Sequence, residues 1–117
     1  ELSLAALEAV AFQTKEIISS LAKDGIKVDS VRIDGGLTRN AFFNQILSSV
    51  IGLEVLCSKT VESTALGAAF LAGIGSGEVS LQDVAKNWSP KAEYNPDSSY
   101  DLGRYDTWKE FLSKLIS

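Results

Sequence analysis

The sequence predicts an α/β fold in which short parallel strands are connected and packed by helices. Two segments with alternating apolar residues, 29–34 and 53–57, have the period of β-strands. A segment with helical period, 39–51, lies between them, and strands joined through a helix pair in parallel with a right-handed crossover. Helical patterns also flank this unit on both sides. We therefore expect one domain over residues 1–117.

Composition is that of a globular protein and argues against several functions. Hydrophobic residues make up 45% and charged residues 22% of the 117 residues, which are ordinary values. A net charge of −4 argues against a nucleic-acid partner, which usually needs a basic face, and no apolar run approaches the ~20 residues that span a bilayer. With one cysteine, Cys57, and no histidine, a zinc site or a Cys/His or Ser/His pair is not expected.

Two further expectations follow from the residue types that are rare here. A lone cysteine cannot form an internal disulfide, so we expect a cytoplasmic setting. The chain contains no methionine and opens directly into a helical pattern. We therefore expect a piece of a longer polypeptide, with a trimmed small protein as the alternative.

Residues 3–23 have the apolar spacing of an amphipathic helix. Its expected buried stripe consists of Leu7, Val10, Ala11, Thr14, Ile18 and Leu21. Ser3 is the predicted N-cap, and Gly25 is the predicted stop. The polar pair Gln13 and Thr14 has two interpretations, a contact with a ligand or a satisfied pair between packed helices.

A glycine turn follows the first predicted strand and leads into the helix over 39–51. Gly35 and Gly36 let a ligand approach the backbone closely, and the helix start presents unpaired N–H groups and a positive dipole end. Asn40 lies in the first turn of the helix, where its amide can reach such a ligand. The alternatives are a turn without a ligand and an Asn40 that caps the helix, unless Thr38 is the cap.

Small residues dominate the next helical segment, 62–73. A glycine inside a helix costs ~1 kcal/mol relative to alanine, so Gly67 indicates close approach of another backbone or of a ligand. Gly52 is predicted to end the helix before it. The glycines at 73, 75 and 77 are predicted to end this one, and their spacing is not that of a phosphate loop.

The C-terminal part is predicted to contain two more helices. Ser80 and Asp83 resemble a capping box that opens a short helix ending near Asn87. Residues 88–103 contain both prolines and many polar residues, so we expect a surface connection. Asp106 is the predicted cap of the last helix. Its apolar stripe, which we expect to pack on the domain or to form an oligomer contact, is Trp108, Phe111, Leu112, Leu115 and Ile116.

Four segments, in this order and spacing, resemble the C-terminal domain of the FGGY carbohydrate kinases, and most closely the members that phosphorylate glycerol. The segments are residues 7–14, residues 32–40 followed by Gln45, residues 64–69 and residues 104–109. Gln13-Thr14 and the aspartate before the double glycine favour the glycerol branch over the xylulose branch. The resemblance covers nearly the whole chain.

This resemblance implies half of an actin-like, ribonuclease-H-like ATPase domain. It implies that Gly35, Gly36 and Asn40 bind the adenosine of ATP in a kinase that converts ATP and glycerol, or another small polyol, to ADP and glycerol 3-phosphate. The catalytic aspartate, the phosphate loops with Mg²⁺ and the acceptor site are implied in earlier segments. No catalytic or metal-binding residue is therefore assigned here, and Asp34 receives a structural role. Because phosphoryl transfer needs these parts together, we expect the isolated 117 residues to be inactive.

Two other functions stay open at this point. A non-catalytic nucleotide-binding or assembly subunit is the first, and the full-length reading frame would distinguish it from a kinase. A Rossmann-like oxidoreductase domain is the second, but the sequence has no G-x-G-x-x-G motif and no acidic ribose partner at the required position. A homo-oligomer is compatible with either.

Overall fold

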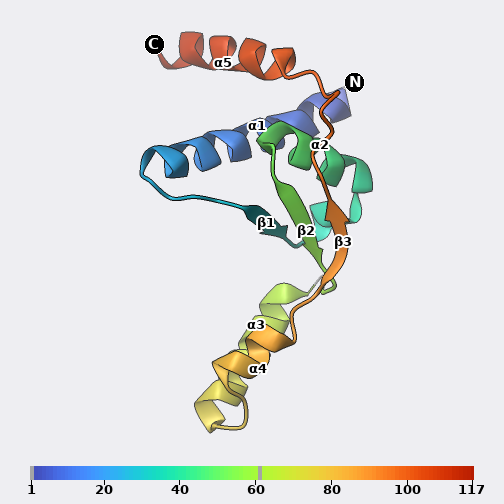
Figure 1. Cartoon of the computed structure of the whole chain (residues 1–117), viewed down its shortest axis with the longest axis vertical. Coiled ribbons are helices and arrows are strands. Elements are labelled where there is room, and N and C mark those ends of the chain that lie inside the picture. The colour runs from blue at the N-terminus through green and yellow to red at the C-terminus, as the bar shows by residue number, and fades with distance from the viewer. Residues whose placement is uncertain (1, 61) are drawn as a thin grey trace.

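The computed structural model describes residues 2–60 and 62–117 as an elongated molecule with two regions (Figure 1). The upper region, called the body, contains α1, α2, α5 and a sheet, and the lower region, called the arm, contains α3 and α4. In chain order the elements are α1 (Leu2–Lys23), β1 (Ser30–Ile33), the 3₁₀ turn η1 (Gly36–Arg39), α2 (Ala41–Ile51), β2 (Glu54–Ser58), α3 (Ser63–Ser76), α4 (Leu81–Lys86), β3 (Pro90–Tyr94) and α5 (Gly103–Ile116).

The dimensions show how far the arm extends from the body. The molecule measures 53 × 30 × 25 Å, and its radius of gyration is 17.1 Å. A compact chain of this length has a radius of gyration of about 13 Å. The single domain expected over 1–117, which includes the undescribed residues 1 and 61, stays a prediction.

The sheet has the strand order β1-β2-β3 and combines both kinds of pairing. β1 and β2 are parallel, with Val31 opposite Val55, which confirms the pairing predicted from the strand–helix–strand pattern. β3 runs antiparallel to β2, with Tyr94 opposite Val55. The prediction of a plain connection over 88–103 was therefore wrong. Pro90 begins this edge strand, a position that tolerates proline. The half-buried Pro90, Ala92 and Tyr94 alternate with the exposed Lys91 and Glu93, but this strand pattern spans only five residues of a segment that is otherwise polar.

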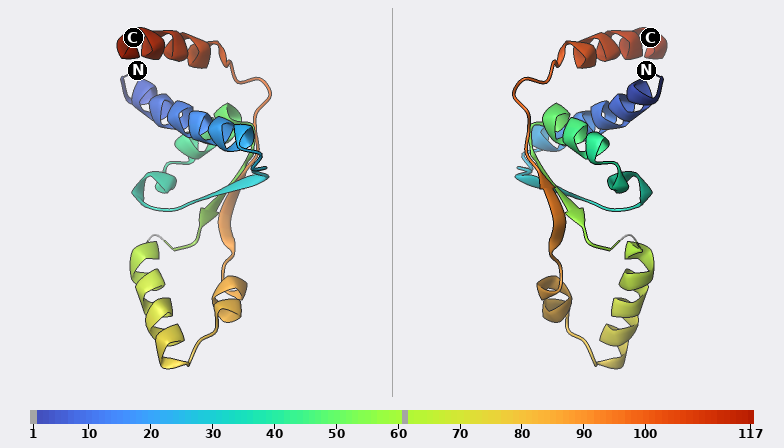
Figure 2. Two further views of the ribbon diagram at one scale, coloured as in Figure 1. Left: turned by 90° about the vertical axis from the view of Figure 1, so that its left-hand side faces the viewer. Right: turned by 90° about the vertical axis from the view of Figure 1, so that its right-hand side faces the viewer.

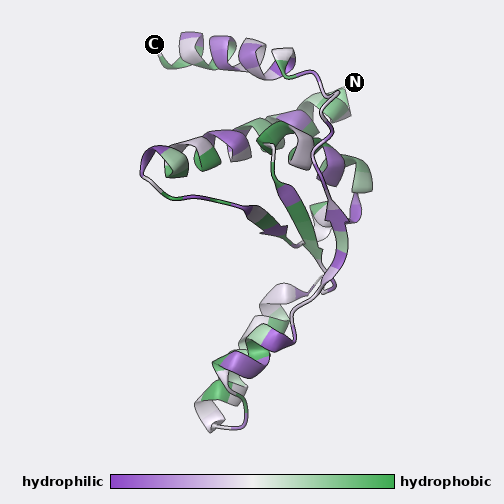
Figure 3. Ribbon diagram, in the orientation of Figure 1, coloured by the Kyte–Doolittle hydropathy of each residue, from purple (hydrophilic) through white to green (hydrophobic). Residues whose placement is uncertain are grey.

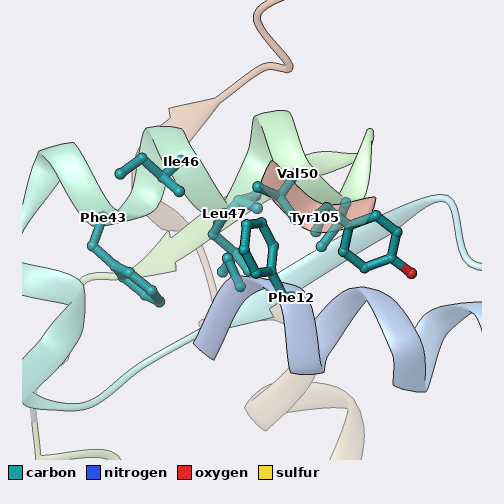
Figure 4. Packing of buried hydrophobic residues seen from close by; sticks show 9 residues of the cluster. Phe12, Phe43, Ile46, Leu47, Val50 and Tyr105 are labelled. Atoms are coloured by element: carbon teal, nitrogen blue, oxygen red, sulfur yellow. The ribbon is translucent and has the colours of Figure 1, made fainter. Parts of the chain in front are cut away.

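The core lies where α1 packs along α2 above the sheet (Figure 4). Phe12 from α1 and Tyr105 from α5 contact the buried face of α2, and the ring centroids of these two residues are 5.5 Å apart. The buried hydrophobic residues are Ala11, Phe12, Phe43, Ile46, Leu47, Val50, Ile51, Val55, Cys57 and Tyr105. All but two of them come from helices, so helix packing provides most of the core.

The sequence prediction for α1 is confirmed at the C-terminal end of the helix and is wrong at its N-terminal end. Gly25 ends the helix with φ 81°, and the N–H of Ile26 donates to the carbonyl of Leu21 at 2.9 Å, as expected for a glycine stop. At the other end the helix already includes Leu2. Ser3 is therefore inside the helix, and the N-cap assigned to it was wrong because a cap lies outside helical backbone.

The buried face of α1 agrees with the predicted stripe except at Val10, which is 43% exposed. Ala11 is buried, and Leu7 and Ile18 pack against the core, whereas the buried Glu8 and Phe12 were not part of the prediction. The Thr14 hydroxyl donates to the carbonyl of Val10 at 2.8 Å, so this polar side chain is satisfied within its own helix.

Helix α5 is held on α1 by aromatic packing and by two buried or half-buried carboxylates. Tyr105 packs against Phe12, and its hydroxyl donates to Glu16. The Tyr100 hydroxyl donates to Glu8 at 2.8 Å, and Arg104 forms an ion pair with Glu8 at 2.9 Å. Burial, and then the hydrogen bonds to Glu8 and Glu16, raise the pKa of Tyr100 and of Tyr105 to about 12.

The remainder of α5 differs from its prediction. The helix begins at Gly103 after Leu102, so Asp106 lies within it and does not cap it. Of the predicted stripe, Phe111, Leu115 and Ile116 are exposed. The residues of α5 that belong to or pack against the core are Tyr105 and Trp108, in its first two turns.

The arm contains α3, the most apolar of the longer helices, and no described residue of α3 is buried. Helix α3 contains no charged residue, and its visible side in Figure 3 carries weakly polar and apolar residues. Of the three glycines predicted to end α3, Gly77 does so, with φ 80°. The prediction was wrong for Gly73 and Gly75, which lie inside the helix. The capping box of α4 is confirmed, since Ser80 and Asp83 exchange hydrogen bonds at 3.1 and 3.2 Å.

The close approach predicted at Gly67 is absent among the described residues. A Cβ atom built on Gly67 meets no atom within 4 Å, so the predicted approach of another backbone was wrong for the described residues, whereas the approach of a ligand stays a prediction. A close approach occurs instead at Gly73, near the end of the same helix, where a Cβ atom would lie 2.8 Å from a methyl group of Val79. None of the described helices combines the length and the apolar character that crossing a bilayer requires.

Candidate functional site

The glycine turn between β1 and α2 has a conformation that requires its first glycine. Gly35 has φ 93°, a region that side chains with a Cβ rarely adopt. Its carbonyl accepts two hydrogen bonds from Thr38, at 3.2 Å from the N–H and at 2.7 Å from the hydroxyl. This bonding closes residues 36–39 into η1. The helix predicted from residue 39 therefore begins at Ala41.

The second glycine leaves the turn open. A Cβ atom built on Gly36 meets no atom within 4 Å, and its φ is not positive. Nothing in the fold of the described residues therefore demands glycine at this position. The open space above the backbone is what a ligand that packs against the turn would need.

Asn40 is the N-cap of α2, one of the two roles that the sequence left open for it. Its Oδ1 accepts from the N–H groups of Phe42 and Phe43, at 3.1 and 3.2 Å. Thr38 bonds to Gly35 and does not cap the helix. The Asn40 Nδ2 makes no hydrogen bond within residues 2–60 and 62–117, so this exposed amide remains free to donate to a ligand.

Asn44 is a further polar residue at this site that sequence reasoning missed. Its side chain is 1% exposed, and its Nδ2 donates to the carbonyl of Thr38 at 2.8 Å. Asn44 lies one helical turn after Asn40, on the face of α2 that carries Phe43 and Leu47. A polar residue on that apolar face is the signal that could have identified it.

Gln45, which follows the glycine turn at the spacing noted in the sequence, has a structural role. Its Nε2 donates to the carbonyl of Asn95 at 2.8 Å, which ties α2 to the segment after β3. Neither Gln45 nor the exposed Gln13 reaches the glycine turn through a hydrogen bond of the described residues.

A cleft of about 580 Å³ lies below the turn, between the carboxyl ends of β1 and β2 and the two helices of the arm. Asp34 lies on its wall, directly before the glycine pair, but the predicted site residues do not line it. The Arg32 guanidinium stacks on the Trp88 ring at 4.1 Å across this cleft. Figure 2 shows η1 and α3 projecting from the same side of the sheet, η1 above α3.

The groups that this site presents are suited to recognition of a ligand. Within the described ranges, no cluster of three His, Cys, Asp or Glu side chains has the arrangement that holds a metal ion. Cys57 is buried, and burial raises the pKa of its thiol, which disfavours the reactive thiolate. An open backbone turn, a helix start and an amide donor are suited to a purine or a ribose, which carry no charge.

Comparisons with known proteins agree with this geometry. The profile of the FGGY family of carbohydrate kinases, C-terminal domain, matches residues 1–76. Glycerol kinase from Coxiella burnetii is 36% identical over 116 residues, which are 97% of this chain and 23% of that protein. Glycerol kinase from Pediococcus pentosaceus is 37% identical over 113 residues, which are 93% of this chain and 22% of that protein.

Solved structures show the same architecture. The crystal structure of Plasmodium falciparum glycerol kinase with ADP matches with a TM-score of 0.69 and 33% identity, over 94% of this chain and 22% of that one. Xylulose kinase from Lactobacillus acidophilus shares the fold, with a TM-score of 0.80 at 21% identity, over 97% of this chain and 24% of that one. The chain thus spans under a quarter of these relatives, and the predicted half of an actin-like domain is confirmed.

Proposed function

This chain belongs to the FGGY family of carbohydrate kinases, and on that premise we propose that it forms the C-terminal part of an ATP-dependent glycerol kinase. The identity of 33–37% to proteins named glycerol kinase supports glycerol as the acceptor. In this proposal the acceptor and the catalytic base belong to the part of the relatives that this chain does not span. The chain contributes the wall of the cleft that holds adenosine.

The open turn at Gly36 supports the nucleotide assignment most directly. Its free space lies at the start of α2, and the Asn40 amide has a free donor beside it. A purine ring or a ribose can pack on Gly36 while its acceptor atoms receive a hydrogen bond from Asn40. The positive end of the α2 dipole favours the negative charge of a nucleotide.

The residues described here do not fit a magnesium site of their own. Mg²⁺ prefers several oxygen ligands, and the described residues provide no carboxylate cluster near the turn. In this proposal Mg²⁺ is held by the nucleotide phosphates and by other segments of the kinase. Asp34 has a structural place before the glycine turn.

The arm supports the proposal that the functional kinase is a longer chain. A helix that is apolar on all sides is normally buried. Helix α3 has this composition, contains no charged residue and is not buried by the described residues. We propose that the rest of the kinase covers it, with the cytoplasm as the compartment because the only cysteine is a buried thiol.

The test separates the ligand contact from the structural roles of the same residues. In the full-length kinase, Gly36→Val fills the open space and should weaken ADP binding at least tenfold while glycerol KM changes little. Asn40→Ser keeps an N-cap side chain but loses the amide, and should weaken ADP binding by ~0.5–1.5 kcal/mol. Titration calorimetry with ADP and acceptor kinetics on the same variants measure both effects.

Two controls make the result decisive. Gly35→Val, which strains a residue with φ 93°, should lower the melting temperature, whereas Gly36→Val should not. The nucleotide assignment is wrong if Gly36→Val and Asn40→Ser fold normally and bind ADP like wild type. If the 117 residues alone catalyse ATP-dependent glycerol phosphorylation, the proposal that the catalytic base and the acceptor site lie outside this chain is wrong.

A further inference from the structure

A chain of side-chain hydrogen bonds links the glycine turn to the interior of α2. The Thr38 hydroxyl donates to the Gly35 carbonyl at 2.7 Å, and the Thr38 carbonyl accepts from Asn44 Nδ2 at 2.8 Å. Asn44 is 1% exposed and is among the most deeply buried side chains of the protein. Asn44 therefore anchors the middle of the turn on the buried face of α2.

The other half of the Asn44 amide is left without a partner. Within the part of the chain that the structure describes, Asn44 Oδ1 is the buried side-chain polar atom that makes no hydrogen bond. Reversing the amide would direct its oxygen at the Thr38 carbonyl, so the bond to Thr38 determines the orientation. A buried acceptor without a partner destabilises the folded state, and a leucine at this position would not carry that acceptor.

This cost indicates that Asn44 is not optimal for stability. Its neighbours on the same face of α2, Phe43 and Leu47, are apolar and buried. What Asn44 provides instead is a hydrogen-bond donor from the interior to η1. We propose that Asn44 is a positioning residue that holds the Gly35–Asn40 turn in the shape that binds the nucleotide.

The proposed role acts through the backbone and rests on the nucleotide site proposed above. Asn44 is buried, so its side chain is not exposed to a ligand that packs on the turn from outside. Its Nδ2 fixes the Thr38 carbonyl, Thr38 fixes the Gly35 carbonyl, and Gly36 lies between these two residues. A turn that is held before the ligand arrives loses less conformational entropy on binding, and the affinity is higher for that reason.

The discriminating variant is Asn44→Leu, because its two expected effects have opposite directions. It removes the donor to Thr38, so ADP binding to the full-length kinase should weaken about 2- to 12-fold, the range that corresponds to one net hydrogen bond. It also removes the unpaired acceptor from the interior, so the melting temperature should stay within about 3 °C of wild type or rise. Glycerol KM should not change.

Thr38 provides the matched pair of control variants. Thr38→Val has nearly the same shape but loses the hydroxyl, and should weaken ADP binding in the same direction as Asn44→Leu. Thr38→Ser keeps the hydroxyl and should bind ADP like wild type. Because the two residues act in one chain of bonds, the Thr38→Val and Asn44→Leu effects on ADP affinity should not add.

The results divide cleanly between the two proposals. If Asn40→Ser weakens ADP binding and Asn44→Leu leaves it unchanged, the positioning role is overturned and the nucleotide site stands. If ADP affinity and melting temperature fall together in Asn44→Leu, Asn44 has a merely structural role and the inference also fails. If Asn40→Ser, Gly36→Val and Asn44→Leu all bind ADP like wild type, the nucleotide site itself is wrong and both proposals fall.

Discussion

Helices α2 and α3 each come after a strand and a short connection, yet α2 is largely buried and α3 is not. In α2, Phe43, Asn44 and every residue from 46 to 51 are buried. In α3, which is three residues longer and similarly apolar, no described residue is buried. The difference lies in the partner, because α2 packs along α1 whereas α3 extends into the arm. Apolar composition therefore predicts that a helix needs a partner but does not identify it.

The hydrogen bonding of the two regions differs in the same way. The body holds long-range bonds such as Ser48 to Tyr94 at 3.0 Å and Tyr100 to Glu8 at 2.8 Å. In the arm, the side-chain bonds are local, such as Ser76 to Gly73 at 3.0 Å. Regions with few buried contacts open at low free energy, so we expect the arm to unfold before the body in the 117-residue chain.

The largest expected effect comes from truncating the same residue type in both helices. Leu47 of α2 is 3% exposed, and Leu71 of α3 is 72% exposed. Leu47→Ala should cost ~2–5 kcal/mol, whereas Leu71→Ala should change the unfolding free energy of the 117 residues by less than ~0.5 kcal/mol. Urea unfolding, with Trp108 reporting the body and Trp88 the junction with the arm, measures both.

The same pair tests whether the rest of the kinase covers the arm. In the full-length chain, Leu71→Ala should cost ~2 kcal/mol or more, because the side chain would then be buried. Ile116→Ala on the exposed end of α5 is the control and should have no such effect. Equal stability of wild type and Leu71→Ala in the full-length chain would mean that α3 stays uncovered.

The next effect concerns pH and applies to the body alone. The pKa values of Tyr100 and Tyr105 lie at about 12 in the folded chain, above the ordinary value of 10.0. Since a raised pKa means that the folded state holds the proton more tightly, their contribution is complete below pH 10 and is lost as pH rises towards 12. The stability of the body should therefore fall between pH 10 and 12.

Tyrosine variants show whether these two groups cause that fall. Tyr100→Phe and Tyr105→Phe each remove the titrating hydroxyl that bonds to Glu8 or Glu16, so the slope of stability against pH in this range should become shallower. Chemical unfolding at intervals between pH 8 and 12 measures the slope. An unchanged slope in the double variant would assign the alkaline loss to other groups.

The smallest effect is a contrast of two glycines within α3. Gly67→Ala adds a methyl group in open space and should stabilise the isolated chain by ~0.5–1 kcal/mol through helix propensity. Gly73→Ala places its methyl group 2.8 Å from Val79, a stiff β-branched side chain, and should cost about 1 kcal/mol. Thermal melting followed by circular dichroism compares the two. If Gly67→Ala is destabilising in the 117 residues, the space above Gly67 is not open.

Local signals in the sequence predicted most of the elements and several of their ends. Gly25 and Gly52 end helices, and Ser80 with Asp83 begins one, because each of these roles is played within a few residues of the chain. The parallel pairing of β1 and β2 was also predicted, since a helix between two strands leaves little choice. The glycine turn and Asn40 were recognisable from the amino-acid sequence for the same reason, since their signals lie within one short segment.

Tertiary structure decided what depends on residues far apart in the chain. The pairing of β3 with β2 and the anchoring of α5 through Tyr105 result from contacts over long sequence distances. The exposure of α3 results from the lack of such contacts among the described residues. Asn44 shows the limit within a single helix. Its type marks it as an exception on an apolar face, but only the fold brings its amide to Thr38 and leaves its oxygen unpaired, because hydrogen-bond partners are determined by position in space.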